Sequence, residues 1–515
     1  MAKTDSRTSK SIKNSSVALV FYFINLVLQF FSRKIFLDYL GAEVLGLNTT
    51  ATNLLQFLNL AELGIGAAVS YNLYKPLFEG DKQAINDIVS IQGWLYRRIA
   101  LMVIVGACVL MCFFPLIFAK AEVPLWYTYG TFLALLISAL LGYFVNYRQI
   151  VLSADQKEYK VTYCLKGGMA VKAAVQMTII YLLDNSYVWW MVLEAVFAVI
   201  ISVVLDKTIK KEYPWLRPTV KQGKKRRKLY PAIITKTKQV FFHKIGSFVL
   251  GQTTPLVIYG YASLTLVAIY GNYMLIVMGV TALMNALLNG LVAGIGNLVA
   301  EGDKQKIKSV FWQISILRIW MASVVCFGMY TLGDLFVMLW VGEEYMMPHS
   351  AFLVLISITF IQLTRTNDAF LSAYGLYKDI WAPVAEASLN LGLSVFLGYF
   401  YGLTGILIGV LISLLVIVCG WKPYFLYRNG FKEGIGEYVR KCLKLGLLLL
   451  SSCWLSHKII GVLFNHPISS YVGWTMYSLQ VIGVYVPMSV CLLYVTDVTA
   501  RNLGIRIYHI IKNKE

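Results

Sequence analysis

The strongest constraint on this chain is a recurrence of apolar runs about 20 residues long, from Val17 almost to its C-terminus. A helix rises 1.5 Å per residue, so about 20 residues cross a hydrocarbon core of about 30 Å. The runs follow one another closely, and no soluble domain of any size fits between them. The sequence therefore predicts one all-α polytopic membrane domain.

The composition agrees with this prediction. Of 515 residues, 58% are hydrophobic and only 14% are charged, whereas soluble domains carry about 25% charged residues. The mean hydropathy is +0.66. The first 16 residues are polar and basic, and the apolar run that follows continues past Phe31 without a small-residue cleavage site. We therefore expect a retained first helix and no signal peptide.

We predict about fourteen transmembrane helices, at residues 17–37, 45–74, 89–118, 125–148, 159–183, 187–206, 240–261, 266–298, 309–333, 349–372, 380–401, 403–421, 442–464 and 471–495. With both termini in the cytoplasm, 40 of the 46 Lys and Arg residues fall on the cytoplasmic side. This asymmetry follows the positive-inside rule. It predicts a multi-pass protein of the cell membrane with cytoplasmic N- and C-termini.

The net charge of +20 would suggest nucleic acid in a soluble protein, but here membrane topology accounts for it. The basic stretch at 221–228, KQGKKRRK, favours orientation beside anionic membrane lipids over nucleic-acid binding. We expect no nucleic-acid partner.

An internal repeat relates the two halves of the chain. The pentapeptide EGDKQ occurs at 79–83 and again at 301–305, an offset of 222. The tripeptides LIS and LSA recur at an offset of 219, at 136–138 and 355–357 and at 152–154 and 371–373. Six helices per half make the repeat parallel. This predicts two six-helix lobes, at 1–205 and 240–421, a basic cytoplasmic linker at 206–239, and a final part at 422–515 with helices 13 and 14 and a cytoplasmic tail.

Polar residues form stripes along several predicted helices. In helix 1, Asn25, Gln29 and Arg33 recur every four residues, and in helix 2 Asn48, Thr52, Gln56, Asn59 and Glu62 share one face. Such a stripe either holds helices together or lines a hydrated cavity. We favour a cavity, and the predicted substrate-binding residues are Asn25, Gln29, Arg33, Asn48, Thr52, Asn59, Lys172, Arg365 and Asn390.

Charged side chains within the predicted helices are candidates for function because they are costly in hydrocarbon. Lys172 lies about 13 residues, or about 20 Å, into helix 5 and needs a carboxylate, an anion or water. Lys166 and Arg318 lie nearer the cytoplasm, where snorkelling explains them. Arg365 and Asp368 have the spacing of an ion pair. Glu62, Asp368 and Glu386 are the predicted ion-coupling candidates.

We find no catalytic constellation. The five histidines include no HxxxH, and the chain has no phosphate-binding loop, nucleophile elbow or metal-ligand cysteine spacing. We therefore expect no enzyme activity, no cofactor and no metal. The short outer loops also oppose a membrane polysaccharide polymerase or glycosyltransferase.

Several motifs resemble a known family. The stretch LGAEVLGLN followed by LAELGIGAA at 40–68, ADQKEY at 154–159, EYPWL at 212–216, LWVGEEY at 339–345, and AYGLYKD with EASLN within 365–390 are similar to Wzx-type polysaccharide flippases. The likeness is to the Gram-positive branch of the multidrug/oligosaccharidyl-lipid/polysaccharide exporter superfamily. It covers nearly the whole chain, and the order of the motifs carries it.

The resemblance implies lobes that open alternately to either side, a trailing helix pair, and transfer of undecaprenyl-pyrophosphate-linked oligosaccharide to the outer leaflet. Arg33, Glu62, Arg365 and Glu386 match charged positions of the family. A departure is Thr253-Thr254-Pro255, where the family often has an acid, which weakens the case for an ion site in helix 7. Expected partners are the lipid-linked substrate and the polymerase and glycosyltransferases of the same pathway.

Three alternatives remain at this point. A multidrug exporter of the same fold would have cavity cations of the wrong sign for cationic drugs. A membrane polymerase or glycosyltransferase would need larger outer loops, and a non-transporting scaffold would leave the polar stripes without a role.

Overall fold

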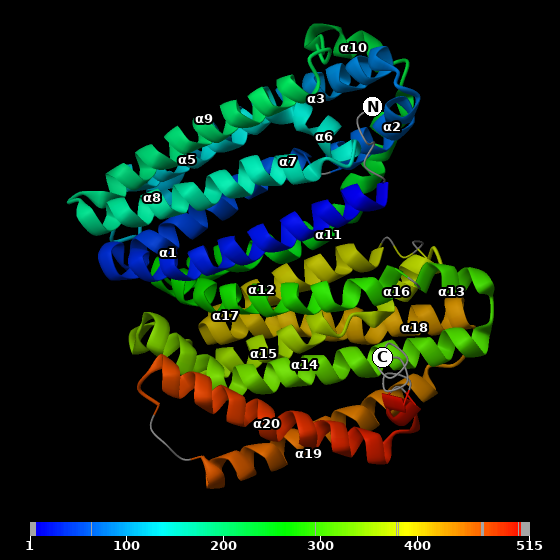
Figure 1. Ribbon diagram of the computed structural model, residues 1–515. Helices are drawn as coiled ribbons and strands as arrows, with labels where there is room; N and C mark the ends of the chain where they lie inside the picture. Colours follow the sequence, from blue (N-terminus) through cyan, green and yellow to red (C-terminus); the bar gives the residue numbers. More distant parts are fainter. Residues whose placement is uncertain are drawn as a thin grey trace. The chain divides into compact units, whose positions relative to one another are not determined.

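The structure is a computed structural model that describes residues 7–505 apart from 63, 294, 377, 378, 380, 465–467 and 503. Within these ranges, it does not describe the side chains of 7–12, 61, 238, 239, 242–251, 286–293, 297 and 300. All regular structure in the described residues is helical (Figure 1). The chain divides into two compact units, unit 1 at Met1–Ala268 and unit 2 at Ile269–Glu515, and each is described by itself.

Unit 1 contains eleven α-helices and four short 3₁₀ or π segments among its described residues. They are α1 (Arg7–Leu58), η1 (Asn59–Glu62), α2 (Ile65–Glu79), α3 (Lys82–Cys112), α4 (Phe114–Ile117), α5 (Leu125–Phe144), η2 (Asn146–Gln149), α6 (Ile150–Ala154), α7 (Glu158–Thr162), η3 (Tyr163–Gly167), α8 (Gly168–Leu182), α9 (Ser186–Glu212), η4 (Val220–Gln222), α10 (Gly223–Arg226) and α11 (Pro231–Tyr261).

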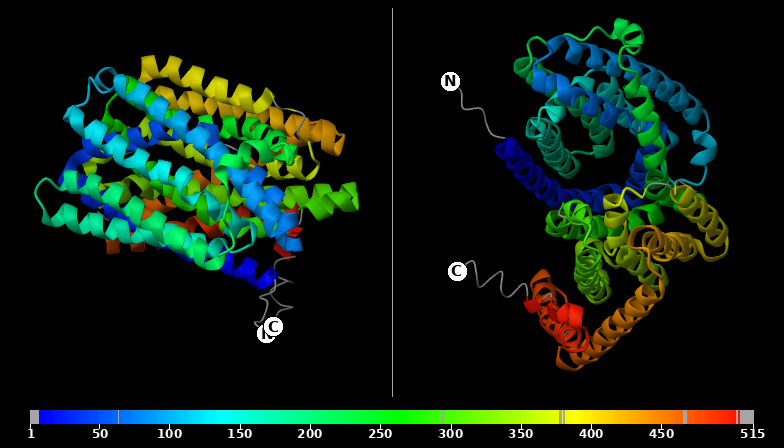
Figure 2. Two further views of the ribbon diagram at one scale, coloured as in Figure 1. Left: turned by 90° about the horizontal axis from the view of Figure 1, so that it is seen from above. Right: turned by 90° about the vertical axis from the view of Figure 1, so that its right-hand side faces the viewer.

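The remaining helices belong to unit 2, apart from the first turn of α12. They are α12 (Leu264–Ala293), α13 (Ile295–Glu301), α14 (Lys304–Val341), η5 (Glu343–Tyr345), α15 (His349–Leu363), α16 (Thr366–Ala373), α17 (Trp381–Leu414), η6 (Leu415–Trp421), α18 (Lys422–Leu426), η7 (Tyr427–Phe431), α19 (Gly436–Leu463) and α20 (Tyr471–Thr496). The trailing helices α19 and α20 pack along each other at the margin of this unit (Figure 2).

The predicted membrane spans coincide largely with helices of the described chain. Ten helical stretches of the described chain are long and apolar enough to cross a membrane. Two of these, Lys13–Leu58 and Trp381–Phe431, are interrupted by non-helical backbone at Gly41 and Gly402. A straight helix of 52 residues would be about 78 Å long, far more than a bilayer needs, so each stretch supplies two spans. Residues 158–182 and α11 occupy the remaining predicted positions.

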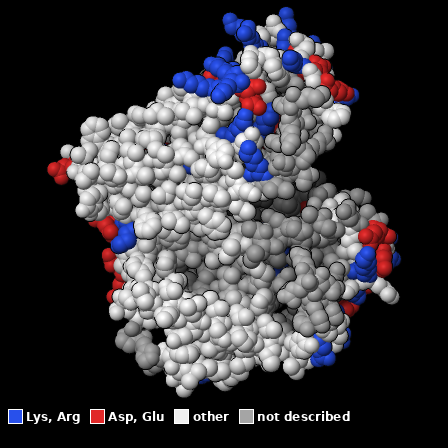
Figure 3. All heavy atoms as spheres, in the orientation of Figure 1, with Lys and Arg blue, Asp and Glu red and all other residues white. Residues whose placement is uncertain are grey.

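The middle parts of the helices carry few charged side chains. On the face in Figure 3, Lys, Arg, Asp and Glu gather near helix ends, and a broad surface between them carries almost none. Exposed side chains of α3, including Leu101, Val105 and Val109, are large and apolar. Exposed apolar surface of this extent requires a lipid environment.

The sequence repeat corresponds to repeated backbone geometry. In both copies of EGDKQ, the glycine has a left-handed φ, +73° at Gly80 and +78° at Gly302. The next residue, Asp81 or Asp303, accepts backbone N–H groups at the start of α3 or α14. The motif thus ends one helix and caps the next, as its glycine and aspartate dictate.

The offset of 219 also appears in the backbone. Gln156 and Gly375, which are 219 residues apart, both have left-handed φ values, +58° and +65°. Each follows a short helix that carries the LSA tripeptide, α6 in unit 1 and α16 in unit 2. The two halves therefore share helix breaks as well as residues.

The segment between α9 and α11 is folded against α3 in unit 1. Arg226 of α10 forms an ion pair with Asp87, and the backbone N–H groups of Arg217 and Thr219 donate to Asn86 (2.7 Å) and Ser90 (2.8 Å). We predicted a linker at 206–239; its first residues continue α9 to Glu212, its last residues belong to α11 from Pro231, and the segment between them contacts α3. Helix α11, predicted as the first helix of the second lobe, packs on α1 and α2.

A second set of contacts fixes the end of α9. Glu212 accepts hydrogen bonds from Lys157 and Lys160, and the Tyr213 hydroxyl donates to Asp155 at 2.7 Å. Burial and the neighbouring Asp155 carboxylate raise the pKa of Tyr213, which keeps this donor protonated. The family-like motifs ADQKEY and EYPWL thus meet in one structural contact.

A substitution at Gly223 can test the contact between α10 and α3. A Cβ atom there would clash with the Ser90 carbonyl and would lie 2.6 Å from the Trp94 Cβ. We expect Gly223→Ala to loosen α10 and to speed tryptic cleavage at 224–228 about tenfold, because overpacking costs about 1–3 kcal/mol. The control is Gly142→Ala, whose added Cβ meets no atom within 4 Å. Equal cleavage of both variants would contradict the docked arrangement.

Candidate functional site

Unit 1 contains a break within its second span. The helix that follows Gly41 ends at Leu58, the 3₁₀ turn η1 covers Asn59–Glu62, and α2 begins at Ile65. Gly64 has φ +94°, and a Cβ there would lie 2.8 Å from the Thr237 carbonyl oxygen and 2.9 Å from the Phe241 nitrogen of α11. Only glycine permits both this conformation and this contact. The continuous helix that we predicted at 45–74 is therefore wrong, because the helix that carries Asn48 is interrupted between Asn59 and Gly64.

The break presents two predicted site residues to tyrosines of neighbouring helices. The Tyr96 hydroxyl of α3 donates to Glu62 Oε1 at 2.8 Å, and the Tyr143 hydroxyl of α5 donates to Asn59 Oδ1 at 3.0 Å. The two tyrosine rings meet edge to face at 5.4 Å. Irregular backbone within a membrane helix is typical of a binding site.

The other candidates of unit 1 are dispersed over its helices. Arg33 donates to the Ala268 carbonyl at 2.9 Å, and Asn25 donates to the Phe21 and Lys166 carbonyls. Thr52 bonds back to the Asn48 carbonyl within its own helix, and Gln29 is exposed. These geometries do not gather all the predicted residues into one pocket of unit 1.

Lys172 has a carboxylate partner that the sequence analysis did not identify. Its Nζ lies 2.6 Å from Glu194 Oε1 of α9, and the side chains are 17% and 8% exposed. Gln176 donates to the second Glu194 oxygen at 3.1 Å. The pair has no net charge, so the first role of Lys172 is to neutralise the Glu194 carboxylate. Its i, i+4 companion Gln176 was the available sequence signal for a polar contact on this face.

This pair predicts a clear coupling between two mutations. Lys172→Met leaves a buried carboxylate uncompensated and should lower the unfolding free energy by about 3 kcal/mol. Adding Glu194→Gln should recover most of the loss. The measurement is a double-mutant cycle of detergent unfolding, with the exposed Lys166→Met as control. Strictly additive effects of the two substitutions would show that the contact does not contribute.

Unit 2 brings four charged groups together, with Asp368 among them. Arg365 lies between α15 and α16 and contacts Glu386 of α17 at 3.2 Å and Asp368 at 3.6 Å. Lys422 of α18 contacts the other Asp368 oxygen at 2.8 Å. The pair with Asp368 fits the prediction made from the sequence spacing, whereas the contacts of Arg365 with Glu386 and of Lys422 with Asp368 were not predicted.

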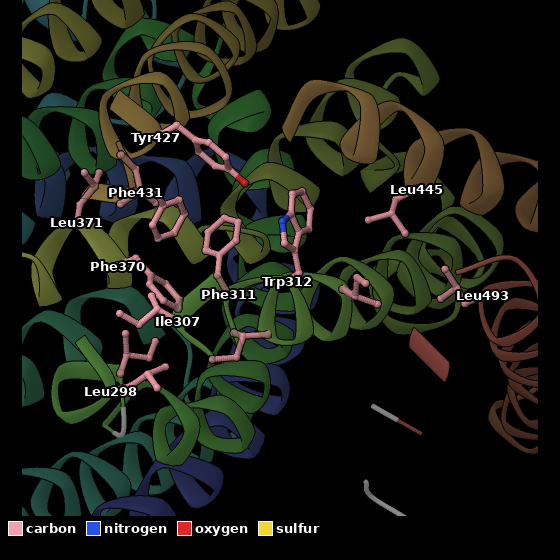
Figure 4. Close-up of a cluster of buried hydrophobic side chains, with 14 of the residues drawn as sticks. Leu298, Ile307, Phe311, Trp312, Phe370, Leu371, Tyr427, Phe431, Leu445 and Leu493 are labelled. Carbon is pink, nitrogen blue, oxygen red and sulfur yellow. The ribbon is translucent and has the colours of Figure 1, made fainter. Parts of the chain in front are cut away.

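Aromatic packing holds α16 in place beside this cluster. Phe311 of α14 packs against Phe370 of α16 and Phe431 of η7, with ring centroids 5.1 and 5.2 Å apart. Figure 4 shows these rings converging, with the Tyr427 hydroxyl pointing toward the Trp312 indole. The position of the charges is therefore set by a rigid apolar core.

Two further predicted residues continue along α17. Glu386 is 3% exposed and Asn390, one turn later, is 1% exposed. The Asn390 amide nitrogen is buried and has no hydrogen-bond partner among the described residues. Such a group marks a place where a ligand or water is expected.

An open apolar pocket of about 840 Å³ lies in unit 2, lined by α14, α15, α17, η6 and α19. Phe327, Phe360, Leu449, Trp454 and His457 are among its lining residues. The chemistry of this cavity suits a hydrocarbon chain and offers little to a sugar.

Comparisons with solved structures identify the fold. A structure titled lipid II flippase MurJ, inward closed conformation, matches with a TM-score of 0.65 and 13% identity, over 92% of this chain and 98% of that chain. An inward-facing multidrug resistance MATE family transporter of the MOP superfamily matches with a TM-score of 0.60 and 14% identity, over 82% and 99%. A MATE protein in a bent conformation matches with a TM-score of 0.52 and 13% identity, over 82% and 96%.

These matches show that the chain shares the fold of those transporters, and its long apolar helices make it a multi-pass membrane protein. No family model matches the chain, and no curated protein sequence matches it significantly. The predicted all-α fold with lobes and a trailing pair is confirmed.

Proposed function

We propose that this protein is a flippase that moves undecaprenyl-pyrophosphate-linked oligosaccharide from the inner to the outer leaflet by alternating access, for surface polysaccharide biosynthesis. The observation that carries the proposal is the extent of the fold match. The flippase structure matches 92% of the chain, whereas the multidrug transporters match 82%. The flippase structure therefore accounts better than the multidrug transporters for a chain that continues through the trailing pair α19 and α20.

The sign of the intramembrane charge supports an anionic substrate. Arg33 lies within the first span, and Arg365 with Lys422 gives the Asp368 cluster its cationic side. Arginine and lysine replace the hydration of a pyrophosphate by charge-assisted hydrogen bonds. The same groups repel the cationic drugs that a multidrug exporter would carry.

The remaining features suit the other two parts of such a substrate. Amides such as Asn59 and Asn390 provide hydrogen bonds for sugar hydroxyls, and the apolar cavity of unit 2 suits part of a polyprenyl chain. The positive-inside asymmetry supports cytoplasmic termini, with the basic 221–228 segment beside anionic lipids. Polymerase and glycosyltransferases of the same pathway are the proposed protein partners.

Purified protein in liposomes that contain a labelled lipid-linked oligosaccharide tests the proposal. We expect the wild type to expose the internal label to an impermeant reagent, and Arg33→Gln to slow this at least about tenfold, because a lost charge-assisted contact costs about 1.5–3 kcal/mol. Lys75→Gln is the control, since Lys75 is exposed and its ion pair with Glu79 lies on the surface. No transfer by well-folded wild-type protein would contradict the proposal.

A further inference from the structure

The helix break of unit 1 contains a carboxylate that forms no ion pair with the side chains that the structure describes. Glu62 lies at the end of η1 and accepts a hydrogen bond from the Tyr96 hydroxyl at 2.8 Å. Of the two basic residues that follow on α3, Arg97 is exposed, and Arg98 lies over the Trp94 ring at 4.3 Å. A negative charge within a membrane span is costly, so Glu62 calls for a cation.

The geometry of η1 places an amide oxygen beside this carboxylate. A 3₁₀-helix has three residues per turn, so side chains at positions i and i+3 eclipse each other. Asn59 and Glu62, the first and last residues of η1, have this spacing. The Tyr143 hydroxyl of α5 joins the two, because it donates to Asn59 Oδ1 at 3.0 Å and interacts with Glu62. The carboxylate and the amide oxygen are therefore neighbours.

A third oxygen comes from α3. Gln92 lies one turn before Tyr96 on the same face of α3, and its side chain interacts with the Tyr96 hydroxyl. Gln92 is 1% exposed, and its Oε1 is buried without a hydrogen-bond partner among the described residues. Buried acceptors are nearly always satisfied in proteins, so this oxygen points to a ligand at the break.

The oxygen atoms and the charge together select the kind of ligand. Carboxylate and amide oxygens are ligands of hard metal cations. Interrupted membrane helices also coordinate such ions with backbone carbonyls at the end of the broken helix, and α1 ends at Leu58, directly before η1. A water molecule would satisfy Gln92 but not the charge of Glu62. A monovalent cation neutralises the single carboxylate, whereas a divalent cation would leave a positive charge in the span.

We propose that Asn59, Glu62 and Gln92 bind a monovalent alkali cation such as sodium at the break between η1 and α2. Carboxylate and amide oxygens each have more than one acceptor site, so the tyrosine hydrogen bonds and the cation can be accommodated together. Tyr96 and Tyr143 are positioning residues that hold the carboxylate and the amide side by side. The inference goes beyond the proposed function and is compatible with it, because the Asn59 amide nitrogen can donate to a sugar while its oxygen faces the cation.

The test is binding of radioactive sodium to the purified full-length protein in detergent, measured by scintillation proximity in a choline buffer. We expect saturable binding to the wild type and binding at least about tenfold weaker for Glu62→Gln, which removes the charge. Gln92→Leu removes one neutral ligand and should weaken binding by about threefold to tenfold. The control is Glu122→Gln, which removes an exposed carboxylate of unit 1 and should leave binding within about twofold of wild type.

The effect of sodium on stability separates a cation site from a structural hydrogen-bond network. A ligand that binds only the folded state raises the unfolding temperature. Sodium should therefore stabilise the wild type and Glu122→Gln against unfolding, but not Glu62→Gln. If the network is structural, or if a lysine of a neighbouring helix neutralises Glu62, sodium stabilises none of these proteins and does not bind saturably. That result overturns the inference.

A second variant keeps the inference testable if Glu62→Gln does not fold. Gln92→Leu then decides, and sodium binding equal to that of the wild type would contradict the site. Competition tests the charge argument, since lithium should displace the labelled sodium and calcium should do so at least about tenfold less effectively. Displacement by calcium at a lower concentration than by lithium would overturn the assignment to a monovalent cation.

Sodium binding is measured without transport, so this inference and the proposed function can fail separately. A wild type that binds sodium but transfers no lipid-linked oligosaccharide contradicts the function and keeps the site. A wild type that transfers the lipid but binds no sodium contradicts the site alone.

Discussion

The cost of charge in hydrocarbon governs this structure. In unit 1 that cost is met by pairing, since Lys172 and Glu194 neutralise each other and Gln176 fills a remaining acceptor site. In unit 2, Arg365 and Lys422 pair with Asp368 and Glu386, so two cations meet two carboxylates. The first arrangement stabilises two helices against each other. The second joins α16 to α17 and α18.

The helix breaks place these groups. Gly64 interrupts the second span, so Asn59 and Glu62 meet tyrosines of α3 and α5. The break before α16 in unit 2 exposes Arg365 to Glu386 and Asp368. Glycine caps and short 3₁₀ or π segments thereby place polar groups at defined positions within apolar spans.

Much of the fold could be predicted from the sequence because hydrophobic length fixes the spans and a repeated EGDKQ fixes the corresponding helix ends. The site was harder to predict. The partner of Lys172 is 22 residues away on another helix, and a periodicity argument within one helix cannot find it. The interruption at Gly64 was also not predicted, since the sequence does not show that this glycine has a positive φ. The contact of Lys422 with Asp368 was not predicted, because it depends on the packing of α16 and α18.

The central claim is that intramembrane positive charge selects an anionic lipid. It is tested most directly by comparing lipids that carry the same oligosaccharide on a pyrophosphate and on a neutral glycerol anchor, in liposomes with wild-type protein. The account predicts transfer of the pyrophosphate lipid at least about tenfold faster than transfer of the neutral lipid. Equal rates for both lipids would contradict it.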